Sequence, residues 1–256
     1  MPQSTLTLSS RQPGLYGKLH THGDFVSRRL PQEFVSPWDE WLQGGIAECK
    51  VVLGSAWESI YRDAPVWRFL LAPGACGDSA WAGIVQPSVD RVGRYFPLTI
   101  AAALPPDTDA LCTLFAAASW YSEVEREAAV TFEGIGSLDD LDSRLEGLMF
   151  PADCLVAAVD ADEDTLPIAE RVFSAMKVSL RNDNVSCDAA KAALGLEQVA
   201  VGPWDCLWMN TGSSHLEPVL LVTKALPAPR YFCALLDGQW EAHGWESDAK
   251  VAVSSG

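Results

Sequence analysis

Two histidines and an aspartate lie close together in the stretch KLHTHGDF, residues 18–25, near the amino terminus. On an extended segment His20 and His22 lie on the same side of the chain and could share a metal ion, while Asp24 could add an oxygen ligand. Three protein ligands and a water suffice for a mononuclear site. One interpretation of this stretch is therefore a metal-dependent hydrolase that uses the His20/His22/Asp24 cluster.

The competing interpretation is a turn in which Gly23 takes a backbone angle that most residues avoid and Asp24 hydrogen-bonds to nearby amides. Metallo-β-lactamase-like hydrolases carry the pattern HxHxDH, but Phe25 stands here in place of the last histidine. The two remaining histidines, His215 and His243, lie in the last fifth of the chain. We favour the turn and expect no metal ion at this position.

A second polar cluster lies in PSVDRVGRYFPLT, residues 87–99, between two apolar stretches. Arginine side chains present a planar fork that suits carboxylates and phosphates, so this loop could clamp an anion or a protein partner. Alternatively, Asp90 or another carboxylate pairs with an arginine and pins the loop in place. Loops carry function more often than the elements they connect, so we take this loop as the best candidate surface. The candidate partner-binding residues are Asp24, Asp90, Arg91, Arg94 and Tyr95.

Other catalytic signatures are missing from the sequence. There is no GxSxG nucleophile elbow, and the glycine-rich stretches at residues 14–17 and 74–77 match neither the P-loop pattern nor GxGxxG. The seven cysteines are scattered without a CxxC pair, so we expect reduced core thiols in a reducing compartment, and neither disulfides nor a zinc site. The sequence thus predicts a protein that is not an enzyme and that uses no cofactor.

The formal net charge of −16 is unevenly distributed along the chain. Residues 1–94 contain nine basic and nine acidic residues, whereas the rest of the chain contains nine basic and 25 acidic ones. Because no basic patch is available to neutralise phosphates, we expect neither nucleic acid nor an anionic membrane as a partner. The acidic part could attract a basic protein, but solubility is the simpler account of its charge.

The amino-terminal stretch MPQSTLTLSSRQPG lacks the apolar segment of a signal peptide. No apolar run approaches the length of about 18 residues that a membrane-spanning helix needs. We therefore expect a cytoplasmic protein without membrane insertion.

Alternating helices and strands must position these polar segments. After Pro31, apolar residues recur at helical spacing, and this face comprises Phe34, Trp38, Trp41, Leu42 and Ile46. Proline is tolerated in a first helical turn, so we expect this helix to begin at Pro37 with Ser36 as its cap. Further helices are predicted over residues 56–63, 108–126, 137–148, 188–194 and 229–236. Strands are predicted over residues 15–20, 66–72, 81–86, 96–104, 206–209 and 218–223.

Strands interleaved with helices indicate an α/β domain with helices on both faces of a sheet. The fold class that we predict is a three-layer αβα sandwich with a mixed sheet. We expect residues 1–13 to form a flexible lead and residues 14–256 to form a single domain. Acidic residues gather between positions 150 and 166, which form either a linker or an exposed loop.

Several segments together resemble the TagF (ImpM) family of accessory proteins of bacterial type VI secretion. The resemblance covers residues 14–104, which include GLYGKLHTHGDFVSRRLPQEFVSPWDEWLQ, APVWRFLLAPG and AGIVQPSVDRVGRYFPLTIAA, and less closely residues 203–240. The string PSxDxxGRxFPL is specific to it. The stretch that carries the histidines matches as GKLxxxGDF, a pattern that asks for no histidine at position 20 or 22.

The resemblance implies a three-layer α/β sandwich and a cytoplasmic protein that represses the assembly of a type VI secretion system after translation. It implies a protein partner, the forkhead-associated scaffold protein of that system, whose threonine-phosphorylation pathway the family opposes. A structural component of the secretion apparatus is a further alternative. No catalytic or binding residue carries over from the family, so the contact residues above rest on the physical argument alone, and the oligomeric state is left open.

Overall fold

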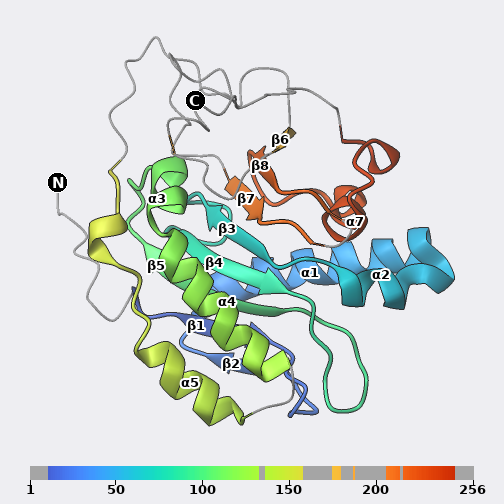
Figure 1. Ribbon diagram of the computed structural model, residues 1–256, viewed down its shortest axis with the longest axis horizontal. Coiled ribbons are helices and arrows are strands. Elements are labelled where there is room, and N and C mark those ends of the chain that lie inside the picture. Colours follow the sequence, from blue (N-terminus) through green and yellow to red (C-terminus); the bar gives the residue numbers. More distant parts are fainter. Residues whose placement is uncertain are drawn as a thin grey trace.

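The computed structural model describes residues 11–132, 136–157, 175–179, 187, 206–213 and 216–245. Its framework is one eight-stranded sheet flanked by helices (Figure 1). The strands are β1 (Gly14–Gly17), β2 (Val26–Arg28), β3 (Trp67–Leu71), β4 (Ala80–Gln86), β5 (Leu98–Leu104), β6 (Ala175–Ser179), β7 (Cys206–Asn210) and β8 (Val219–Thr223). The helices are α1 (Gln32–Leu53), α2 (Trp57–Asp63), α3 (Ala110–Ala116), α4 (Ala118–Phe132), α5 (Leu138–Glu146) and α7 (Pro229–Asp237).

The strands are hydrogen-bonded in the order β2-β1-β5-β4-β3-β7-β8-β6. Every pairing between described strands is antiparallel, so the prediction of a mixed sheet is wrong. Short connections join β3 to β4 and β4 to β5, and such connections return the chain in the opposite direction, whereas parallel neighbours need a crossover of about a dozen residues or more. The helices between other strands suggested crossovers, but the strands that follow these helices also pair antiparallel.

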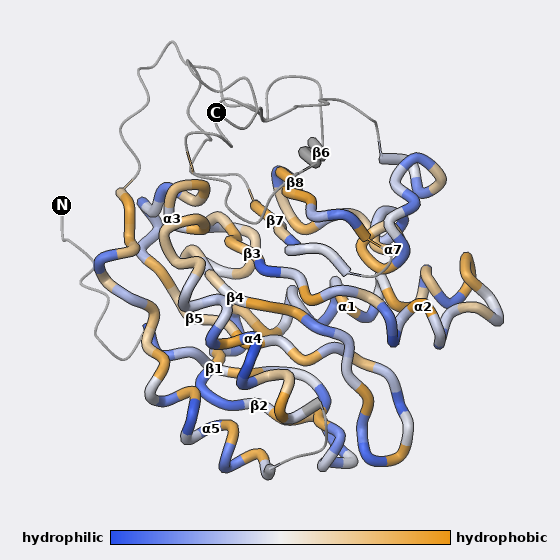
Figure 2. The backbone as a smooth tube through the Cα atoms, viewed as in Figure 1, coloured by the Kyte–Doolittle hydropathy of each residue, from blue (hydrophilic) through white to orange (hydrophobic). Residues whose placement is uncertain are grey.

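Neighbouring residues along each strand enter two different hydrophobic cores, because strand side chains alternate between the faces of a sheet. In β4, Ala82 and Ile84 belong to the core that α3, α4 and α5 cover, whereas Trp81 and Val85 belong to the core that α1, α2 and α7 cover. Strands β4 and β8 are among the hydrophobic stretches in Figure 2. Helices therefore cover both faces of the sheet.

Helix α1 confirms the predicted apolar face. The five residues of this face are all buried: Phe34, Trp38, Trp41, Leu42 and Ile46. The helix begins at Gln32, directly after Pro31, so the expected start at Pro37 is wrong. Pro37 lies inside the helix, where a proline removes one backbone hydrogen bond. Burial of the aromatic face on both sides of Pro37 outweighs this loss.

The other predicted elements inside the described ranges are present, with differences at their ends. The helix predicted over residues 108–126 is two helices, α3 and α4, that meet at Ala117. Helix α5 starts after Ser137, whose hydroxyl accepts a hydrogen bond from the Asp140 amide while the Asp140 carboxylate accepts one from the Ser137 amide. The helix predicted over residues 188–194 lies outside the described residues.

The predicted acidic linker or loop is described only as far as residue 157. Within this part Phe150 is fully buried, and its ring packs edge-on against Trp120 at a centroid distance of 4.8 Å. The Phe150 amide donates a hydrogen bond of 2.9 Å to the carbonyl of Arg11. This start of the segment is therefore packed on the domain, and residues 158–166 lie outside the described ranges.

The expectation of reduced thiols is wrong for Cys112 and Cys187, which form a disulfide with a Cα–Cα distance of 5.3 Å. The two residues are 75 positions apart, and spacing in sequence carries no signal of a pairing that the fold creates. Four other cysteines are buried in the cores, as expected: Cys49, Cys76, Cys206 and Cys233.

Among the helices that the structure describes, none combines the length and the apolar content that crossing a bilayer requires.

Candidate functional site

The two polar segments singled out in the sequence meet in space. The loop between β4 and β5 runs beside the segment that precedes β2 (Figure 1). The Arg91 amide donates a 3.0 Å hydrogen bond to the His22 carbonyl, and the Ser88 hydroxyl donates one of 2.8 Å to the Lys18 carbonyl. The Arg94 guanidinium donates to the carbonyl of Gly23. We call residues 18–25 and 87–96 together the junction.

Asp90 is the centre of the junction. Its carboxylate is buried and accepts hydrogen bonds from Lys18 Nζ at 2.7 Å and from Arg94 Nε at 2.6 Å. The backbone amides of Val92 and Arg94 donate to its other oxygen at 3.0 and 2.8 Å. Burial alone raises the pKa of this carboxyl, but the hydrogen bonds from Lys18, Arg94 and Val92 outweigh burial and hold the pKa well below its usual range. Asp90 is therefore a charged, fully engaged group that shapes the loop.

Tyr95 ties the junction to helix α2. Its hydroxyl accepts a hydrogen bond from the Arg62 guanidinium and donates one of 3.1 Å to Glu58 Oε2. Its ring packs edge-on against the buried Tyr61 at a centroid distance of 5.5 Å. The Tyr61 hydroxyl in turn donates a hydrogen bond of 3.2 Å to the Ser88 carbonyl. The side of the loop that faces α2 is thus held as firmly as the side that faces Lys18.

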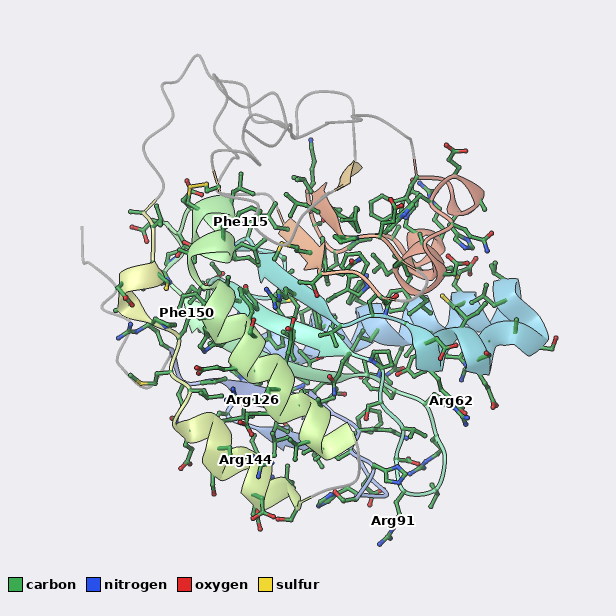
Figure 3. All side chains as sticks on the ribbon, viewed as in Figure 1. Arg62, Arg91, Phe115, Arg126, Arg144 and Phe150 are labelled. Atoms are coloured by element: carbon green, nitrogen blue, oxygen red, sulfur yellow. A yellow bond between two sulfur atoms is a disulfide. The ribbon has the colours of Figure 1, made fainter. Side chains whose placement is uncertain are left out.

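The structure divides the five predicted contact residues into two groups. Asp90 and Arg94 have their polar groups engaged inside the junction, and the Tyr95 hydroxyl is engaged with helix α2. Asp24 and Arg91 are exposed, and within the part of the chain that the structure describes neither side chain has a hydrogen-bond or ion-pair partner. Figure 3 shows Arg91 at the end of the loop, and one of its terminal nitrogens lies 3.8 Å from the place that a Cβ atom on Gly23 would take. Of the five predicted contact residues, these two are exposed and have no such partner in the described part of the chain.

The family-like patterns of the sequence coincide with the residues that build the junction. Lys18 supplies the buried cation, which the search for contact residues missed although the GKLxxxGDF pattern contains it. Gly93 has φ of 86° and follows the exposed tip of the loop, whereas Gly23 is not among the glycines with positive φ, so the expected unusual angle at Gly23 is wrong. Among the described residues, Asp24 likewise accepts no hydrogen bond from a nearby amide. The fixed positions of these patterns are therefore ones that build the junction, and the patterns do not indicate which residues contact a partner.

Gly17 is a second position in these patterns where only glycine fits. Its φ is 135°, and a Cβ atom there would collide with the carbonyl oxygen of Pro97 in the neighbouring chain segment. We predict that Gly17→Ala lowers the free energy of unfolding by about 2–4 kcal/mol, because backbone strain and overlap add. Urea denaturation measures this loss. Gly54→Ala is the matched control, since Gly54 also has positive φ, 52°, but has no atom within 4 Å of the added Cβ; a loss as large as that of Gly17→Ala would contradict the steric argument.

The hydrolase interpretation required three ligands, and the structure does not bring them together. Among the described residues no group of three or more His, Cys, Asp or Glu side chains is arranged to hold a metal ion. His20 is exposed, and His22 Nδ1 lies 2.9 Å from the hydroxyl of Thr21. His243 pairs with Asp237 at 2.8 Å, in the segment after α7. His20, His22 and Asp24 therefore do not form a metal site in this arrangement.

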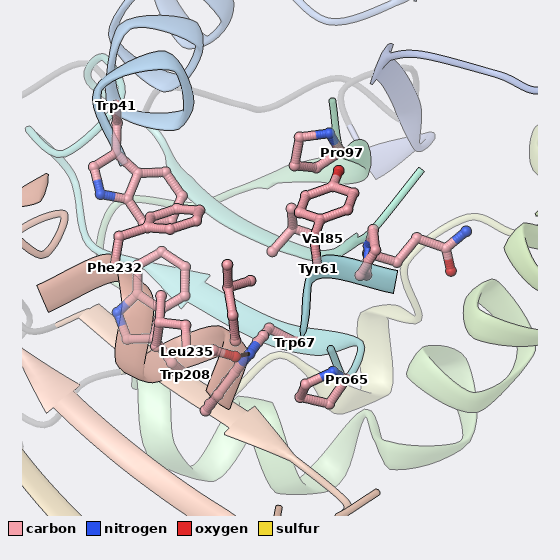
Figure 4. Close-up of a pocket in the computed structure, with 12 residues that line it drawn as sticks. Trp41, Tyr61, Pro65, Trp67, Val85, Pro97, Trp208, Phe232 and Leu235 are labelled. Atoms are coloured by element: carbon pink, nitrogen blue, oxygen red, sulfur yellow. Dashed lines mark hydrogen bonds between the residues drawn. The ribbon is translucent and has the colours of Figure 1, made fainter. Parts of the chain in front are cut away.

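A small apolar pocket lies between the sheet and helices α1, α2 and α7 (Figure 4). It is lined by Trp41, Tyr61, Pro65, Trp67, Val85, Gln86, Pro87, Pro97, Trp208, Phe232, Leu235 and Leu236. Its interior volume of about 30 Å³ is small, about the space of a few water molecules. Its lining is aromatic and aliphatic apart from Gln86, and it presents no cluster of groups that could do chemistry.

Comparison with known proteins adds evidence independent of the junction. The chain matches the family described as TagF N-terminal domain, type VI secretion system-associated, over residues 14–148. It is also similar to the crystal structure of PA0076 from Pseudomonas aeruginosa PAO1, with 32% sequence identity and a TM-score of 0.71. That match covers 95% of this chain and 99% of PA0076. No curated protein matches the chain.

Proposed function

Since the chain belongs to the TagF N-terminal domain family of type VI secretion-associated proteins, we propose that it is a cytoplasmic repressor of the assembly of a bacterial type VI secretion system. The protein acts after translation by binding the forkhead-associated scaffold protein of that system and holding it out of the assembling machine. This activity requires a complementary surface of roughly 800 Å² on each partner and no bond chemistry. Helices on both faces of the sheet support the three-layer sandwich that the family resemblance implies.

The junction is the single structural observation that carries a binding role. It combines two exposed charged side chains, Asp24 and Arg91, with a support of buried, fully paired groups below them. A surface fixed in advance loses little conformational entropy on binding, which favours affinity. We therefore propose Asp24 and Arg91 as contact residues, and Asp90, Arg94 and Tyr95 as residues that position them.

The secretion phenotype of a deletion strain tests the proposed role directly. We expect deletion of this chain in its own bacterium to raise type VI secretion, because a repressor has been removed, and re-expression of the chain to lower secretion again. Secreted tube protein in the culture supernatant is the measurement, and a strain that lacks both this chain and the scaffold protein is the control that should secrete nothing. Loss of secretion in the single deletion would instead identify a structural component of the apparatus.

A further inference from the structure

Resting on the proposed scaffold binding, we propose that Phe25, Arg91 and Val92, here called the apex, form the binding hot spot of this protein. The apex takes a protein surface that presents a carboxylate to Arg91 next to an apolar side chain that packs on Phe25 or Val92. The scaffold protein is the partner that supplies this surface. The inference adds Phe25 and Val92 to Arg91 as contacts and assigns a chemistry to the surface that these three side chains recognise.

The charge argument starts from how the other cations of the chain are used. Every other arginine side chain in the described ranges has an ion-pair, hydrogen-bond or ring partner: Arg11, Arg28, Arg29, Arg62, Arg68, Arg94, Arg126, Arg144 and Arg230. Six of these nine arginines have a carboxylate partner, in a chain with 34 acidic and 18 basic residues. Arg91 has none in the described part of the chain, although Asp24 belongs to the same junction. A planar guanidinium without an internal partner has the geometry to bind a carboxylate of another protein.

The apolar argument concerns Phe25 and Val92, two exposed side chains of the same junction. Phe25 is 48% exposed and Val92 is 65% exposed. Both residues are linked to the buried carboxylate of Asp90. The Val92 amide donates a hydrogen bond to this carboxylate. The Lys18 ammonium pairs with the same carboxylate and lies 5.1 Å from the centroid of the Phe25 ring. Single exposed apolar residues are common, but arginine and phenylalanine are both enriched at protein interfaces, and Val92 adds apolar surface next to Arg91 in the chain.

The rigidity argument concerns the support. The Asp90 carboxylate accepts hydrogen bonds from the amides of Val92 and Arg94 and so fixes the tip of the loop, residues 91–93. The Phe25 ring packs against the rings of Phe96 and Tyr16, at centroid distances of 4.8 and 5.8 Å. Arg91 and Val92, which this bracing holds, are both exposed. The bracing presents the tip in a fixed geometry and so lowers the entropy lost on binding.

Charge reversal at the apex tests the proposal with the full-length chain and the purified scaffold protein of the same secretion system, produced without its threonine kinase. We expect Arg91→Glu to raise the dissociation constant about thirtyfold or more, as at a hot spot, and Arg91→Lys to raise it less because the ammonium retains charge but loses the fork. Val92→Ser is expected to weaken binding about fivefold or more. Isothermal titration calorimetry measures each constant, and the melting temperature should stay within a few degrees of the wild type.

Matched controls lie elsewhere on the surface. Lys224→Glu makes the same charge change at another exposed cation, just after β8, which is four strands from β5 and hence roughly 19 Å from that strand across the sheet. Val51→Ser is the control for Val92→Ser, because Val51 at the end of α1 is 81% exposed. Both controls should bind like the wild type.

The outcomes separate the two proposals. Loss of binding in the apex variants alone supports the apex. Wild-type affinity in Arg91→Glu, or equal loss in Lys224→Glu, overturns the apex while scaffold binding stands. A wild-type chain that binds only scaffold phosphorylated by the kinase overturns the carboxylate chemistry in favour of a phosphate. A wild-type chain that binds neither form of the scaffold overturns the scaffold-binding function and the apex with it.

Discussion

Replacing Asp90 with alanine is expected to lower the free energy of unfolding by about 3–5 kcal/mol. The substitution leaves the ammonium of Lys18 buried without its partner, 5% exposed, and also removes the acceptor of the Val92 and Arg94 amides. Breaking a buried ion pair costs more than the pair contributes, because the remaining charge stays desolvated. The Arg94 side chain is 57% exposed, so water can solvate its guanidinium when Asp90 is removed. Loss of the Arg94–Asp90 ion pair therefore contributes little to the expected destabilisation.

Urea denaturation of Asp90→Ala against the wild type at neutral pH measures this loss. The double variant Lys18→Met with Asp90→Ala removes both buried charges, and we expect it to regain part of the stability. A single variant that unfolds within 1 kcal/mol or so of the wild type would show that the buried pair does not hold the junction. An Asp90→Ala protein that is unstable yet binds the scaffold as tightly as the wild type would contradict the positioning role of Asp90.

The same carboxylate predicts a pH dependence with a definite sign. Its pKa is lower in the folded protein than the value of about 3.9 of an unfolded chain, so the unfolded state binds the proton first. The stabilisation is complete above about pH 4 and declines as the pH falls toward the folded-state pKa. Asp90→Asn should therefore lose less stability than the wild type between pH 5 and pH 2 or so, measured by urea denaturation at each pH. A steeper loss in the variant would contradict the assignment.

Replacing Trp38 with alanine is expected to cost about 3–5 kcal/mol of unfolding free energy, the second large effect. Trp38 is fully buried, and its ring lies 4.8 Å from those of both Trp41 and Phe69. Its indole N–H donates a 2.8 Å hydrogen bond to the hydroxyl of Thr99 in β5. Alanine leaves a cavity that this close-packed aromatic cluster cannot fill, and it removes the link between α1 and the sheet.

Guanidinium denaturation measures the Trp38→Ala effect. Trp38→Phe separates its two parts, because phenylalanine retains most of the ring volume but donates no hydrogen bond to Thr99; we expect a loss of about 1–3 kcal/mol. Val51→Ala serves as the surface control and should remain within about 0.5 kcal/mol of the wild type. A small effect of Trp38→Ala would mean that the core between α1 and the sheet repacks, contrary to the contacts described.

Most local elements could be predicted from the sequence, because each has its own signal. The aromatic face of α1 recurs at helical spacing, and the apolar runs of β4 and β5 are bounded by polar residues. The order and direction of the strands could not be predicted, since they depend on pairings such as Arg68 with Met209 that join distant parts of the chain. The disulfide between Cys112 and Cys187 was missed for the same reason.

For the candidate site, the sequence by itself determined which segments matter and which residue types they carry. It singled out the histidine stretch and the arginine loop, and it left open whether Asp90 pins the loop or meets a partner. Only the tertiary structure shows that Asp90 pins the loop, by placing Lys18 and Asp90, 72 positions apart, in a buried pair. Burial and pairing depend on which segments the fold brings together, and a one-dimensional pattern does not contain that information. The fold thus used Asp90, Arg94 and Tyr95 for its own construction and left Asp24 and Arg91 at the surface.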